Sequence, residues 1–224
     1  MITYKIHFIR HGITQGNMDG RYIGLTDLPL CEEGYAQLRE LQEKFKYPQV
    51  DAVYTSPLSR CTETAEFLYP HREQRTWPKF AECDFGSFEG KTIEELKDDI
   101  EFEKWIGDSY HIAPPGGESG EEFTRRIISG LDDLFGEMMQ EEIRSAAVIT
   151  HGGVIMTLMA AAGLPKHPLN EWAVGSGMGY TILMTPQMWM RDGAFEVYSV
   201  LPEGLLDQAE DFEEQFEDGQ DGPY

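Results

Sequence analysis

Apolar and polar positions follow two different periods along the chain, one typical of buried strands and one typical of amphipathic helices. Short apolar runs predict strands at residues 4–9, 52–54, 146–149, 179–184 and 195–200. Apolar residues three or four positions apart predict helices at residues 32–45, 57–69, 93–96, 101–106, 119–140 and 154–162. The pattern also predicts an extended segment at 76–80 and a turn at 191–193. Strands that alternate with helices favour an α/β fold, a three-layer sandwich whose mostly parallel central sheet has helices on both faces.

Two of the predicted strands end in a histidine followed by glycine. Residues 4–9 lead into Arg10, His11 and Gly12, and residues 146–149 lead through Thr150 into His151 and Gly152. Ligands bind at the carboxyl ends of strands in open α/β sheets. An arginine there can grip an anion, a histidine can act as a nucleophile or a base, and the N-terminus of a helix attracts phosphate. If the two strands are neighbours, their ends form one anion site.

Two further segments supply charged side chains for the same site. Pro57 suits the first turn of a helix and Ser56 its N-cap, which places Arg60 about one turn into that helix. Glu82 lies in an aromatic segment with Phe80, Phe85 and Phe88. Desolvation by these rings would raise the pKa of its carboxyl group.

These four segments, in this order, resemble the histidine phosphatase superfamily, also called the phosphoglycerate mutase-like family. Thr14, Asn17 and the stretches 24–30 and 115–119 add to the resemblance, which runs from about residue 5 to about residue 200. It implies one α/β domain at 1–202 with a small helical cap inserted at about 86–115. Residues 203–224 would then form an acidic C-terminal tail.

The resemblance implies a phosphomonoesterase that needs no metal or cofactor and works through a phosphohistidine. His11 would be the nucleophile, and Glu82 would protonate the leaving oxygen and then take a proton from water. Asp84 and Glu89 are rival acids; we prefer Glu82 because it occupies the family's position before the Phe-Gly pair, whereas we expect Glu89 to be structural.

The resemblance also assigns the residues that would hold the phosphoryl group. Cationic and imidazole groups would surround its oxygens, and neutral or backbone N–H groups would add donors. The first set is Arg10, Arg60 and His151, and the second is Asn17, Gly24 and Gly152. No metal site is expected, because no HxH or HExxH spacing occurs in the sequence.

Three functions are open for this site: two enzyme activities, phosphatase and mutase, and one non-catalytic binding function. The mutases of the family grip a second anionic group with arginines in the cap, whereas residues 84–115 hold three lysines, no arginine and nine acidic residues. Such a cap would repel a doubly anionic substrate, so the sequence favours the phosphatase branch, similar to alpha-ribazole phosphatase, over a phosphoglycerate mutase. A non-catalytic protein that binds a phospho-ligand would be expected to lose His11 or Glu82, and both are present.

Charge and cysteine content narrow the partners and the compartment. The net charge is −22, of which residues 203–224 contribute −9, so nucleic-acid binding is disfavoured. No apolar run reaches the length of a membrane span, and the N-terminus lacks the pattern of a signal peptide. The three cysteines form no CxxC pair, so we expect a reducing, cytoplasmic location. The expected partner is a small phosphorylated substrate, and the oligomeric state stays open, a dimer included.

Overall fold

A single sheet organises the part of the chain that the computed structural model describes, residues 2–205. Seven strands of these residues pair in the order β3-β2-β4-β1-β6-β7-β5. Strands β1 to β4 are parallel to one another, while β6 runs antiparallel to both β1 and β7. The predicted α/β class with a mostly parallel sheet is therefore confirmed. The strands span Tyr4–Arg10 (β1), Ala52–Thr55 (β2), Gln74–Thr76 (β3), Ser145–Thr150 (β4), Gly163–Leu164 (β5), Gly179–Met184 (β6) and Phe195–Leu201 (β7).

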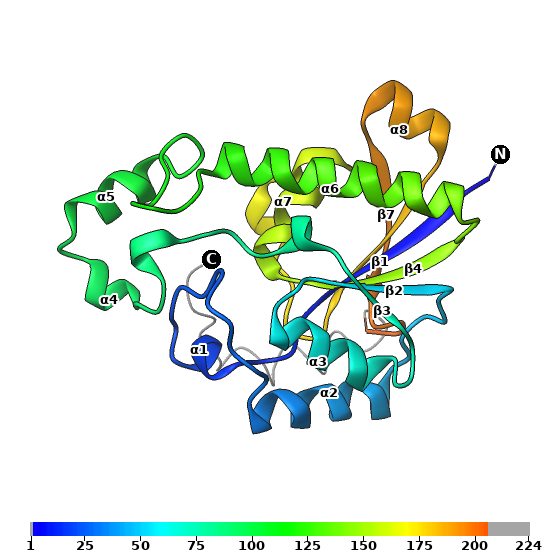
Figure 1. Cartoon of the computed structure of the whole chain (residues 1–224), viewed down its shortest axis with the longest axis horizontal. Helices are drawn as coiled ribbons and strands as arrows, with labels where there is room; N and C mark the ends of the chain where they lie inside the picture. The colour runs from blue at the N-terminus through cyan, green and yellow to red at the C-terminus, as the bar shows by residue number, and fades with distance from the viewer. Residues whose placement is uncertain (1, 206–224) are drawn as a thin grey trace.

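Helices cover both faces of the sheet and give the predicted three layers (Figure 1). Helices α2 (Glu32–Lys44) and α3 (Ser59–Leu68) lie on one face, and α6 (Gly120–Gln140) and α7 (Gly152–Ala162) lie on the other. Strand side chains alternate between the two cores, as the pleat of a strand requires. Phe8 and Val148 pack in the core under α6 and α7, whereas Ile9 and Ile149 pack in the core under α2 and α3.

A small aromatic core holds the predicted cap together. Residues 86–115 include the short helices α4 (Ile93–Leu96) and α5 (Ile100–Gly107), which lie at the end of the molecule far from β7 in Figure 1. Burial of apolar surface within this group keeps the cap folded beside the sheet. Its buried members are Tyr22, Phe88, Leu96, Phe102 and Trp105.

Two local predictions around the third strand were wrong. Helix α3 begins at Ser59 with Leu58 as its N-cap, rather than at Pro57 with Ser56 as the cap. The Ser56 hydroxyl lies 2.7 Å from a ring nitrogen of His151. The side chain that was expected to cap the helix therefore contacts a predicted site residue instead. The predicted extended segment ends at Thr76, because Pro78–Phe80 forms a 3-10 turn that begins with proline.

A further helix, α8 (Pro186–Asp192), lies where the pattern predicted only a turn at 191–193. Thr185 caps it, and Gly193 ends it in the left-handed region with φ 58°. None of its residues is buried. Without a buried stripe the helix has no apolar periodicity, so the sequence pattern could not reveal it.

The predicted acidic tail lies outside the described residues after its first three positions. The Glu203 N–H donates to the Lys46 carbonyl at 2.9 Å, and Leu205 packs against Leu41 and Phe45. In residues 2–205 no helix combines the length and the apolar content that a membrane span needs.

We predict that Gly34→Ala destabilises the protein by about 1–3 kcal/mol, because the added methyl group overpacks a rigid backbone. A Cβ at Gly34 would lie 2.2 Å from the carbonyl oxygen of Ile13, in the loop after His11. Urea unfolding measures the effect. Gly136→Ala in α6 is the control, because a Cβ there meets no atom within 4 Å, and it should stabilise the helix by roughly 0.5–1 kcal/mol. Equal stability of the Gly34 variant and the parent would contradict the prediction.

Candidate active site

The parallel pairing of β1 with β4 brings the two His-Gly segments together. Arg10 lies opposite Thr150 in the register, so the next residues, His11 and His151, leave the sheet side by side. Their ring centroids are 5.2 Å apart in an edge-to-face arrangement. Both rings are buried. The structure thus gathers the two histidines, as their positions at strand ends predicted.

His11 is held as a neutral imidazole with a bare Nε2 atom. Its Nδ1 lies 2.7 Å from the carbonyl oxygen of Gly12, and since a carbonyl only accepts, Nδ1 carries the proton. Burial, followed by the charges of Arg60 and Arg10, holds the pKa of His11 well below its usual 6.5. Nε2 therefore keeps its lone pair at neutral pH, which is the state that a nucleophile requires.

His151 is also neutral, but both of its ring nitrogens already have partners. The Nε of Arg60 donates to Nδ1 at 3.2 Å, so Nε2 carries the proton and donates to the Ser56 hydroxyl at 2.7 Å. Burial, then the charges of Arg60 and His11, lowers the pKa of His151 well below 6.5. In this arrangement His151 orients Arg60. Its N–H is already donated to Ser56, so it has no spare donor for an anion, whereas the sequence had suggested that His151 contacts the phosphoryl oxygens.

Arg60 is a buried cation in the first turn of α3. Its exposed fraction is 1%, and its terminal nitrogens donate to the carbonyl oxygens of Gly24 and Thr26 at 2.7 and 2.9 Å. No carboxylate of residues 2–205 forms an ion pair with it. Burying a charge is costly unless an opposite charge is near, so this site favours an anion. Arg10, whose Nη1 donates to the Val174 carbonyl at 2.7 Å, adds a second buried guanidinium.

Glu89 fastens the loop that supplies those carbonyl groups. Its carboxylate accepts from the N–H groups of Gly24, Leu25 and Thr26 and from the Thr26 hydroxyl at 2.6 Å. Glu89 is thus structural, as expected. The expected role of Gly24 needs a correction, because its N–H is already donated to Glu89 and it serves Arg60 through its carbonyl instead.

Asn17 and Gly152 both line the cavity, as the sequence suggested. The Oδ1 of Asn17 accepts from the N–H and the hydroxyl of Thr14, closing a capping box on α1 (Gln15–Met18). This fixes the amide so that its NH₂ is the end left for a ligand. Gly152 is the first residue of α7, whose first N–H groups carry the positive end of the helix dipole.

Glu82 is a buried carboxyl group that lines the same cavity as His11. Two backbone groups hold it: the N–H of Cys83 donates to Oε1 at 2.9 Å, and the N–H of Gly153 donates to Oε2 at 3.0 Å. Burial raises the pKa of Glu82 above its usual 4.5, although these two hydrogen bonds oppose the shift. A Cβ at position 153 would lie 2.4 Å from Oε1, so the glycine makes room for the acid. Among the rival acids, Asp84 instead accepts from the N–H of Gly86 at 2.9 Å.

The cavity that these groups line has a volume of about 220 Å³ and a lining of two chemical kinds. Its polar lining includes Arg10, His11, Glu82 and Glu118. Its apolar lining includes Tyr22, Phe85, Trp105, Met156 and Leu169. The sequence pattern did not mark these residues as cavity lining, because a large apolar side chain is equally typical of a hydrophobic core.

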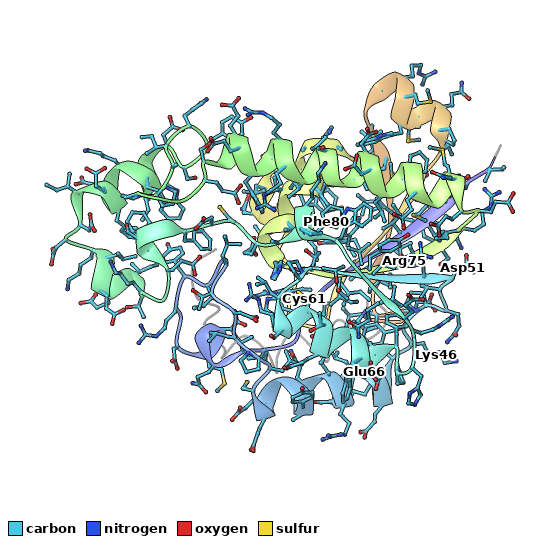
Figure 2. All side chains as sticks on the ribbon, viewed as in Figure 1. Lys46, Asp51, Cys61, Glu66, Arg75 and Phe80 are labelled. Carbon is cyan, nitrogen blue, oxygen red and sulfur yellow. The ribbon has the colours of Figure 1, made fainter. Side chains whose placement is uncertain are left out.

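Cys61, labelled in Figure 2 on α3, packs against His151 without a chemical role of its own. Its sulfur lies 3.6 Å from Nε2 of His151. Burial raises the pKa of its thiol to about 12, so the thiol stays protonated and unreactive. Packing was the expected role.

We predict that His11 stays neutral and keeps its proton on Nδ1 at pH 6. Burial and the two neighbouring guanidinium groups oppose protonation, whereas a free histidine is largely charged at that pH. Nitrogen chemical shifts from two-dimensional NMR of ¹⁵N-labelled protein distinguish the tautomers. His11→Gln identifies the signals. A protonated Nε2 at pH 6 would contradict the assignment.

Comparisons with known proteins identify the family of the chain. The family model of the histidine phosphatase superfamily (branch 1) matches residues 6–189. The adenosylcobalamin/alpha-ribazole phosphatase of Salmonella typhimurium is 29% identical over 163 residues, 70% of this chain and 78% of the relative. Two crystal structures share the fold: the alpha-ribazole phosphatase of Shigella flexneri (TM-score 0.70, 23% identity, 88% of this chain and 96% of that one) and the phosphoglycerate mutase of Bacillus anthracis (TM-score 0.73, 24% identity, 88% and 92%). The chain therefore belongs to the histidine phosphatase superfamily.

Proposed function

We propose that the protein is a metal-independent phosphomonoesterase that hydrolyses a small phosphorylated metabolite through a phosphohistidine. The observation that carries the proposal is the bare Nε2 of His11, in a cavity that also contains a buried guanidinium and a buried carboxyl group. Similarity to named phosphatases adds support. The guanidinium groups of Arg10 and Arg60 take the part of the cations that offset phosphate charge. In the described chain no three His, Cys, Asp or Glu side chains are grouped to hold a metal ion.

The reaction proceeds in two displacements at phosphorus. First, Nε2 of His11 forms a bond to phosphorus as the bond to the leaving oxygen breaks, and protonated Glu82 transfers its proton to that oxygen. Then water attacks the phosphohistidine, the Glu82 carboxylate takes the proton from water, and His11 is regenerated. The raised pKa of Glu82 suits the first step, because it keeps the acid form available closer to neutral pH.

The walls of the cavity favour an alcohol half that is flat and carries no second negative charge. The aromatic rings of Tyr22, Phe85 and Trp105 line the same cavity as His11. Arg21 also lines the cavity, but its guanidinium is paired with Glu95 at 3.1 Å and approaches Asp19 at 3.7 Å. Its charge is therefore already offset.

A phosphoglycerate mutase is the second candidate, because a mutase shares this fold. The acidic cap and the neutralised Arg21 argue against it, since a phosphoglycerate also carries a carboxylate. Efficient interconversion of 2- and 3-phosphoglycerate would favour the mutase. A non-catalytic phospho-ligand binder is the third, and it would neither turn over esters nor trap phosphate on His11.

We predict that the purified protein hydrolyses p-nitrophenyl phosphate in excess chelator and that rapid quench with labelled substrate traps phosphate on His11. The adduct should be acid-labile and base-stable, because phosphorus is bound to nitrogen. His11→Ala should abolish both hydrolysis and trapping, and His111→Ala, in the exposed part of the cap, is the control. Activity that vanishes with chelator and returns with Mg²⁺ would count against the proposal.

Glu82→Gln should slow hydrolysis of alkyl phosphates by about 10²–10⁴-fold and that of aryl phosphates much less, because a poor leaving group needs the proton most. In the parent, kcat/KM for an alkyl phosphate should fall as pH rises through the elevated pKa of Glu82. This alkaline fall should be absent in the variant. Steady-state kinetics on both esters from pH 4 to 8 provide the test, and equal losses on the two esters would exclude Glu82 as the acid.

A further inference from the structure

One arginine outside the cavity holds the main chain that carries Glu82. Arg126 extends from α6 and donates through Nη1 to the carbonyl oxygens of Lys79 and Ala81, both at 2.9 Å. Its Nη2 donates to the carbonyl of Glu82 itself at 3.2 Å. Three carbonyl groups within four residues therefore converge on one guanidinium. The segment they belong to has little regular structure of its own after the turn at Pro78–Phe80.

The remaining donors of Arg126 bind Glu118. Nε donates to one carboxylate oxygen at 3.2 Å, and Nη2 donates to the other. A guanidinium has five N–H donors, so these contacts use all of them. Glu118 also accepts from the N–H of Asp84 at 3.1 Å. Arg126 and Glu118 thus fix the main chain on both sides of Glu82.

This arrangement depends on the planar shape of a guanidinium and not only on its charge. Three carbonyls and a two-point carboxylate contact match a rigid fork of donors, which the single ammonium of a lysine lacks. The Arg126 side chain is half-buried and lies against the ring of Phe123, with its carbon centre 5.1 Å from the ring centroid. Arg126 does not line the cavity in the described structure. It contacts the main chain of Glu82 and the carboxylate of Glu118, which itself lines the cavity.

We propose that Arg126, fixed by Glu118, is a positioning residue that sets the place of the Glu82 carboxyl group relative to the leaving oxygen. The inference rests on the proposed function, because it assumes that Glu82 is the acid. Within residues 2–205 the Glu82 side chain accepts hydrogen bonds from the N–H groups of Cys83 and Gly153 alone, so a shift of its main chain moves the acid away from the substrate. A displacement of about 1 Å can cost about 10²-fold in rate. The loss should fall on the step that needs the acid.

The experiment compares Arg126→Gln and Arg126→Lys with Arg125→Gln, each assayed on an alkyl phosphate and on p-nitrophenyl phosphate. Arg125 is the matched control, because it neighbours Arg126 on α6 but is exposed and paired only with Glu121. Both Arg126 variants should lose about 10–100-fold in kcat on the alkyl ester and roughly threefold or less on the aryl ester. Arg125→Gln should match the parent on both. The alkaline fall of kcat/KM for the alkyl ester should weaken in the Arg126 variants.

A double-mutant cycle with Glu82→Gln completes the test. If Arg126 acts through Glu82, adding Arg126→Lys to Glu82→Gln should cost no further activity on the alkyl ester. Equal losses on both esters, or additive losses in the cycle, would mean that Arg126 only supports the fold, and would overturn the inference. The lysine variant serves if Arg126→Gln fails to fold, as melting temperatures will show. If Glu82→Gln itself shows no preference between esters, the proposed acid fails; if it does and the Arg126 variants do not, only the inference fails.

Discussion

The buried charge of Arg60 is the constraint on which the rest of the site depends. Its guanidinium is bound by two carbonyls and an imidazole, all neutral acceptors, and no carboxylate of residues 2–205 forms an ion pair with it. The loop that contacts Arg60 is also bound by a carboxylate, that of Glu89. This carboxylate accepts from the N–H groups of the loop, and the carbonyl groups remain available to Arg60. The protein thereby keeps a positive charge in a place that water scarcely reaches. Electrostatic attraction between this charge and a phosphate is stronger there than in bulk water.

Burial and that charge sort the titratable groups into useful states. Burial lowers the pKa of His11 and raises that of Glu82, because it disfavours the charged form of each. The neighbouring guanidinium groups push His11 further in the same direction, and they moderate the shift of Glu82. The result is a neutral base beside a carboxyl group that protonates more readily. Two groups with opposite needs are thus set by one environment.

The sequence predicted the residues that would bind the phosphoryl group but not the apolar residues that line the rest of the cavity. The ends of β1 and β4 were predictable because a short apolar run stops at a charged residue, and parallel neighbours bring such ends together. The role of Ser56 was not predictable, because a serine before a proline is typical of a helix cap. Only the fold shows that its hydroxyl contacts His151. The role of Arg126 was not predictable either, because an arginine on an amphipathic helix usually faces solvent. Trp105 belongs to the aromatic core of the cap, and only the fold shows that it also faces the cavity.

The side chains that line the cavity come from two parts of the fold. Strand ends and the first turns of α3 and α7 place the groups that face phosphorus, and these are tied to the central sheet. Three of the cavity's apolar residues, Tyr22, Phe85 and Trp105, belong to or pack against the aromatic core of the cap. Glu89 links the cap to the loop that binds Arg60. A phosphatase and a mutase both share this fold, so the fold by itself does not decide the reaction, and the side chains that line the cavity must do so.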